Sequence, residues 1–185
     1  GILGYLGASG AVSYAEFEGF LKPQLRAAKA AGEYVLLITH YPSSYFVKPT
    51  AERCVTPEEF IGYLNTQPHI LAHISGHTHY NDFIMHGGLY PYPEIVTASL
   101  IEYPQQARMF DLYSDRRNEE FHLRSTFISH TEQPTSLSQE AQKRMLVDAF
   151  ADPADPVYVR QVGAMDLSGI EELIEHAAVK KRIPA

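Results

Sequence analysis

The apolar residues near the start of the chain have helical spacing. Ser13 and Glu16 form a capping-box pattern, in which each side chain satisfies a free backbone N–H of the other residue. Apolar side chains then recur at helical intervals to about residue 31, and Gly32 follows as a stop signal. The residues predicted to share the buried face of this helix are Phe17, Phe20, Leu21, Leu25 and Ala28.

Two short, continuous apolar runs indicate buried strands. The first covers residues 33–39 and is predicted to be buried on both faces, and the second covers residues 70–75. Between them, Thr56-Pro57-Glu58-Glu59 predicts the start of a second helix, which should end near Asn65. This succession of helices and strands is typical of a parallel α/β layer.

The pattern changes after residue 79. Segments 82–86, 94–98, 107–113 and 119–127 resemble strands joined by turns, with a hairpin turn at residues 115–118, so this part should be mainly antiparallel. Helices are predicted at residues 138–150 and 168–181. The fold class is therefore α/β with mixed strand directions, followed by C-terminal helices.

Composition narrows the range of functions. The chain has 185 residues, 45% of them hydrophobic, and a formal net charge of −7, so no basic surface indicates nucleic-acid binding. No apolar run is long enough to cross a membrane, and a single cysteine, Cys54, excludes an internal disulfide framework. We expect a soluble protein whose true N-terminus lies upstream of Gly1, where any signal peptide would also lie.

Three histidines follow the two apolar strands. His40 ends the first run, while His77 and His79 come directly after the second. Neighbouring parallel strands place such ends side by side, so we expect the three rings to converge. Imidazole is the commonest side-chain ligand of zinc and iron, and the sequence therefore predicts a metal site.

These residues also form two motifs of a known family. The motifs His40-Tyr41-Pro42 and Gly76-His77-Thr78-His79, with the strand and loop around residues 96–104, resemble those of the calcineurin-like metallophosphoesterase superfamily. The first motif is close to the version found in purple acid phosphatases. The resemblance implies a four-layer αββα sandwich and a phosphomonoesterase or phosphodiesterase. It further implies two divalent ions (Mn, Zn or Fe) that activate a hydroxide, with His40 and His77 on one ion and His79 on the other.

The chain lacks other motifs of that family. Asp-x-His, Gly-Asp-x-x-Asp and Gly-Asn-His, which supply a bridging carboxylate and the leaving-group histidine, do not occur. We therefore interpret residues 1–127 as the C-terminal half of a metallophosphoesterase domain and residues 128–185 as a helical extension packing on it. The missing N-terminal half, or a second copy of the chain, should cover the exposed sheet faces. This chain alone should bind metal weakly and be inactive.

Two alternatives remain open. The chain could be a non-catalytic binding or assembly module derived from this fold, or it could hold one metal with His40, His77 and His79 alone. His73, Tyr41 and Asp82 are predicted to support a ligand or to contact the substrate. His69 and His86 are interpreted as ordinary strand-end residues.

Overall fold

The computed structural model describes residues 10–46, 53–101, 105–129 and 179–182. The chain divides into two compact units, the first ending at Thr97 and the second beginning at Ala98. The predicted helix at 138–150 and most of the one at 168–181 lie outside the described residues. Residues 179–182 form a strand, so the prediction that the second of these helices extends to residue 181 is wrong.

The first unit contains a mixed four-stranded sheet in the order β1-β2-β4-β3. Strand β1 pairs in parallel with β2, β2 pairs in parallel with β4, and β3 runs antiparallel to β4. The α/β class and the parallel β1–β2 pair are thus confirmed, while the four-layer sandwich stays a prediction. The strands are β1 (Val35–Ile38), β2 (Ile70–Ser75), β3 (Asp82–His86) and β4 (Tyr92–Val96).

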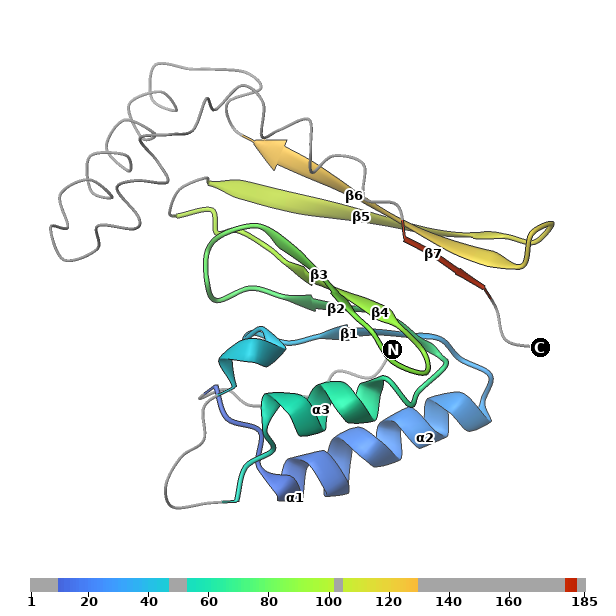
Figure 1. Cartoon of the computed structure of the whole chain (residues 1–185). Coiled ribbons are helices and arrows are strands. Elements are labelled where there is room, and N and C mark those ends of the chain that lie inside the picture. The colour runs from blue at the N-terminus through green and yellow to red at the C-terminus, as the bar shows by residue number, and fades with distance from the viewer. Residues whose placement is uncertain (1–9, 47–52, 102–104, 130–178, 183–185) are drawn as a thin grey trace, which may run out of the picture. The chain divides into compact units, whose positions relative to one another are not determined.

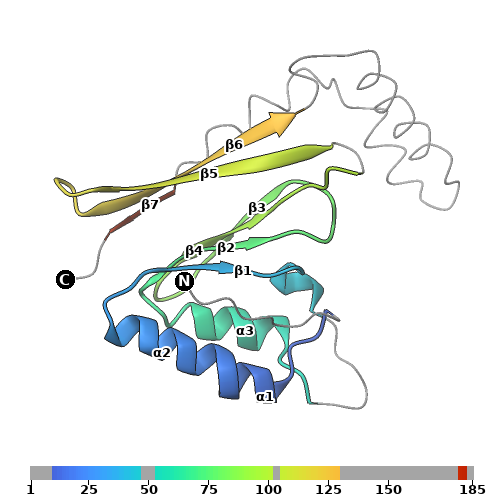
Figure 2. The ribbon, with the colours of Figure 1, turned by 180° about the vertical axis from the view of Figure 1, so that it is seen from behind.

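The helices of this unit lie together on one face of the sheet (Figures 1 and 2). Both predicted capping boxes are present, at Ser13 and at Thr56. The first helix is continuous but has a π-helical segment, and at its end Gly32, with φ +69°, closes a Schellman motif. The helical segments are α1 (Tyr14–Glu16), η1 (Phe17–Leu21), α2 (Lys22–Ala30), α3 (Pro57–Leu64) and the 3₁₀ turn η2 (Ser43–Tyr45).

The hydrophobic core lies between these helices and the sheet. It includes Phe17, Leu25 and Phe60 from the helices and Leu37 and Tyr92 from the strands. Four of the five residues predicted for the buried face of the first helix are buried, and Phe20 is half-buried. The prediction that the first strand is buried on both faces is wrong, because Ile38 is 71% exposed on the face opposite the helices.

The second unit contains a three-stranded antiparallel sheet in the order β5-β6-β7. Strands β5 (Gln106–Asp115) and β6 (Glu120–Ser129) form the predicted hairpin, and β7 (Val179–Arg182) pairs with β6. Asp115 closes the turn by accepting hydrogen bonds from the backbone N–H of Arg117 and the side chain of Asn118. Among the described residues, no helix is long and apolar enough to cross a membrane.

Candidate metal centre

The loops after β1 and β2 are joined by backbone hydrogen bonds. The N–H of Thr39 donates to the carbonyl of Ile74 (3.0 Å), and the N–H of Gly76 donates to the carbonyl of His40 (3.0 Å). Parallel pairing of β1 with β2 therefore continues beyond the strands into the two histidine motifs. The prediction that these strand ends lie side by side is confirmed.

This pairing brings two histidine rings into contact. Nε2 of His40 lies 3.2 Å from Nδ1 of His77, and the ring centroids are 5.1 Å apart. The ring of Tyr41 packs on His77, with centroids 3.8 Å apart, and also meets His40 edge-on. Gly10 lies beneath Tyr41, because a Cβ added there would be 3.1 Å from the phenol ring. The rings of His40, Tyr41 and His77 thus form one packed group.

The backbone is strained at both histidines of the Gly-His-Thr-His motif. His77 has φ +67° and His79 has φ +59°, in the left-handed region that non-glycine residues rarely occupy. Such a conformation costs about 1–3 kcal/mol and is concentrated at functional sites. Such strain is compatible with a functional role for these two positions, although Gln105 and Glu119 also have positive φ.

The electrostatic surroundings of His77 suit metal binding, which requires a neutral imidazole. Desolvation lowers the pKa of His77, and the neighbouring His40 and His79 lower it further. Two nitrogens bound at about 2.05 Å to one tetrahedral zinc ion lie about 3.3 Å apart, which is close to the observed separation of the two ring nitrogens. The 3.2 Å separation is also that of a hydrogen bond between the two rings, so the assignment of His40 and His77 to a single ion stays a prediction.

The described residues do not complete such a site. Among them, no three histidine, cysteine or acidic side chains lie close enough together to hold a metal ion. The mononuclear site built from His40, His77 and His79 is consequently not preassembled in the part of the chain that the structure describes. His79 is near enough to influence the pKa of His77, and its assignment to a second ion stays a prediction.

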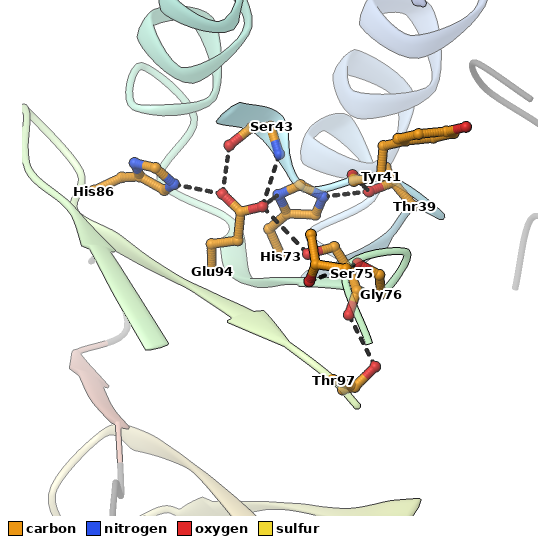
Figure 3. A network of polar contacts seen from close by, with 10 residues as sticks. Thr39, Tyr41, Ser43, His73, Ser75, Gly76, His86, Glu94 and Thr97 are labelled. Carbon is orange, nitrogen blue, oxygen red and sulfur yellow. Dashed lines mark hydrogen bonds and ion pairs between the residues drawn. The ribbon is translucent and has the colours of Figure 1, made fainter. Parts of the chain in front are cut away.

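A buried carboxylate lies behind the two loops (Figure 3). Glu94 on β4 is 0% exposed, and its Oε1 accepts hydrogen bonds from the backbone N–H of Ser43 (2.8 Å) and from Ser75 Oγ (3.3 Å). Its Oε2 accepts from Ser43 Oγ and from His86 Nε2, the latter at 2.7 Å. Nδ1 of His73 lies 3.4 Å from Oε1, an ion-pair distance at which hydrogen-bond geometry is not met.

Glu94 remains ionised within this cluster. Burial by itself raises the pKa of Glu94, but the contacts with His73 and His86 and the hydrogen bonds from Ser43 outweigh it. The net effect places the pKa well below its usual range. A negative charge is thus held inside the unit and is compensated locally.

The hydrogen bonds of Thr39 show that Nε2 of His73 carries a proton. Thr39 Oγ1 donates its single proton to the carbonyl of Tyr41 (2.6 Å), so it must accept from His73 Nε2, which lies 2.7 Å away. Nδ1 of His73 then faces the Glu94 carboxylate, 3.4 Å from Oε1.

The cluster has the residue types of a hydrolase triad without its geometry. Ser43 donates to the carboxylate of Glu94, and no hydrogen bond is described between its hydroxyl and a histidine. Ser43 is also fully buried, so a substrate cannot reach it. The cluster therefore has no nucleophilic role.

The sequence interpretation missed the two ionisable residues that pair with each other in this cluster, His86 and Glu94. His86 is not an ordinary strand-end residue, because it donates to Glu94, and that interpretation is wrong. Glu94 was not singled out, although it lies between Tyr92 and Val96, which occupy the same side of an otherwise apolar strand. A carboxylate at such a core position requires partners, and this signal could have found the cluster.

Three further side chains lie beside the histidine loops. Asp82 Oδ1 accepts a hydrogen bond from the backbone N–H of Phe83 (2.8 Å), at the start of β3. The hydroxyls of Tyr45 and Tyr80 lie 3.3 Å apart, and the hydrogen bond between them, with burial, raises the pKa of Tyr80 to about 12. The second-shell or substrate roles of Asp82, Tyr41 and His73 stay predictions.

Comparison with known proteins gives limited similarity. No family model matches the chain, and no curated protein matches it. Among solved structures, it is similar to a dimetal phosphatase from Danio rerio, with 15% sequence identity and a TM-score of 0.45. The matched region covers 65% of this chain and 39% of the phosphatase, so the chain corresponds to less than half of that protein's length.

Proposed function

We propose that the loops after β1 and β2 carry part of the active site of a metal-dependent phosphoric ester hydrolase. The observation that carries this proposal is the 3.2 Å separation of His40 Nε2 and His77 Nδ1, a spacing suited to one shared ion. The strained backbone at His77 and His79 is compatible with it.

Each histidine has a definite role in this proposal. His40 and His77 hold one divalent ion (Mn, Zn or Fe) through the facing nitrogens, and His79 holds a second. When bound, such ions neutralise charge on the phosphoryl oxygens and make water nucleophilic near neutral pH. Tyr41 supports the ring of His77 and keeps it oriented toward His40.

The acidic ligands must come from elsewhere. Three imidazoles cannot hold two divalent ions close together, because the ions repel each other and need a bridging anion. We place these ligands on the missing N-terminal half of the domain or on a second copy of the chain. The substrate is a phosphomonoester or phosphodiester, and this chain alone is expected to be inactive.

Hydrolysis assays on the full-length gene product test this function. The protein is loaded with Mn²⁺, Zn²⁺ or Fe²⁺ and assayed with p-nitrophenyl phosphate and bis(p-nitrophenyl) phosphate. His77→Ala should abolish hydrolysis and reduce bound metal, whereas His122→Ala, which removes a histidine of the second unit, should change neither. A folded protein that hydrolyses neither ester with any of these metals contradicts the proposal.

A non-catalytic binding or assembly module is the second candidate. It is favoured by exposed apolar residues on the two outer strands of the sheet, Ile38 on β1 (71% exposed) and Met85 on β3 (52% exposed). Exposed apolar side chains at sheet edges can be covered by a partner subunit. Size-exclusion chromatography with light scattering discriminates the two candidates, because a stable oligomer with no bound metal and no activity favours the module.

A further inference from the structure

We infer that Glu94 is a positioning residue, whose single carboxylate ties together the two histidine-bearing loops and sets the distance between His40 and His77. This inference rests on the proposed function for its biological meaning. The contacts between Glu94 and the two loops can be tested in the chain without metal.

The carboxylate holds the His40 loop on both sides. After His40, Ser43 is bound twice by Glu94, through its backbone N–H at 2.8 Å and through its hydroxyl. Before His40, Thr39 accepts from His73, whose other ring nitrogen faces the same carboxylate. The five-residue segment Thr39–Ser43, which bears His40, is therefore held at both ends by contacts that lead to Glu94.

The same carboxylate reaches the His77 loop. Ser75, two residues before His77, donates its hydroxyl to Glu94 Oε1 at 3.3 Å. The carbonyl of Ser75 in turn accepts from both the N–H and the hydroxyl of Thr97, the residue directly after the end of β4. Figure 3 shows Glu94 and Thr97 meeting the Ser75–Gly76 segment from the same strand.

Stability alone does not account for this cluster. Replacing a buried ion pair by well-packed apolar residues is often neutral or even stabilising, so a charge is not needed to fill the core. Directional hydrogen bonds specify distances, which apolar packing does less strictly. A metal site needs its ligands within about 0.5 Å of the productive geometry. The hydrogen bonds to Glu94 restrict the positions of the two loops that carry His40 and His77.

Proton NMR of the chain with selectively labelled histidines provides the test. In the wild-type chain, the carbon-bound ring protons of His40 and His77 should give a nuclear Overhauser cross-peak, because the rings are in contact. Glu94→Gln should weaken this cross-peak, although the backbone hydrogen bond from Gly76 to His40 remains, while the core resonances of Phe60 and Leu25 persist. Leu25→Ala is the control, since it removes core packing on α2 without removing any hydrogen bond of Glu94.

Two milder variants keep the test informative if Glu94→Gln does not fold. Ser75→Ala removes the hydroxyl hydrogen bond from the His77 loop to Glu94, and Ser43→Ala removes one of the two hydrogen bonds from Ser43 to Glu94. Each should weaken the cross-peak, and Leu25→Ala should preserve it. A cross-peak unchanged in Glu94→Gln, or in both serine variants, overturns the inference, as does equal weakening in Leu25→Ala.

The outcome is separable from the fate of the proposed function. If the full-length protein neither binds metal nor hydrolyses esters, but the cross-peak depends on Glu94, the positioning role stands and the hydrolase proposal fails. If hydrolysis depends on His77 while the cross-peak is indifferent to Glu94, the positioning role fails and the hydrolase proposal stands.

Discussion

Replacement of Glu94 should destabilise the first unit strongly, and in a way that depends on pH. Glu94→Ala removes the acceptor of four hydrogen bonds and leaves buried donors on Ser43, Ser75 and His86. Breaking one side of a buried charged cluster costs about 3–5 kcal/mol. Glu94→Gln keeps one acceptor oxygen, so about 2–3 kcal/mol is expected, as for a hydrogen bond to a charged group.

The sign of the pH dependence follows from the lowered pKa of Glu94. Its pKa in the folded state lies below the unfolded value of about 4.3, so the folded state binds fewer protons at acidic pH. The stabilisation from Glu94 is therefore fully present above the unfolded pKa and is lost as the pH falls toward the folded pKa. Tyr92, which packs beside this cluster, stays neutral because burial and the charge of Glu94 raise its pKa.

Urea denaturation followed by circular dichroism measures this effect. The difference in unfolding free energy between the wild-type chain and Glu94→Gln should be largest at pH 6 and should shrink steadily between about pH 4.5 and pH 3. With an m-value of about 2 kcal/mol/M, the midpoint for Glu94→Gln should fall by about 1 M urea at pH 6. A difference that stays constant across this pH range would falsify the assignment of an ionised, stabilising Glu94.

Three other substitutions test separate parts of the structure. Gly10→Ala should destabilise the chain by about 1–3 kcal/mol in the same urea assay, because Gly10 has φ +78° and a Cβ would press on the Tyr41 ring. His79→Gly should leave stability unchanged or raise it by up to about 1 kcal/mol, since glycine adopts the left-handed conformation without strain, and a marked loss would argue against that strain. Thr56→Ala should cost about 1 kcal/mol through loss of the capping box, whereas Thr66→Ala, beyond the end of α3, should cost less.

The sequence by itself determined the local elements and the chemistry at the strand ends. Each capping box, at Ser13 and at Thr56, involves only four consecutive residues. The apolar run of β2 can be recognised from its own six residues. Two parallel strands, each followed two residues later by a histidine, were sufficient to place His40 beside His77. These predictions succeeded because they depend on contacts within one helix or strand, or between two strands that follow each other in the chain and pair in parallel.

The tertiary structure alone decided the strand order and the cluster beneath the site. Strand β4 inserts between β2 and β3, and this non-local pairing brings Glu94 opposite His73 on one side and Ile84 on the other. Ser43 reaches the same carboxylate from a loop 51 positions away in the sequence. The hydrophobic pattern of the sequence does not predict this contact. The free energy of a buried charge depends on which donors surround it after folding and not on its neighbours along the chain.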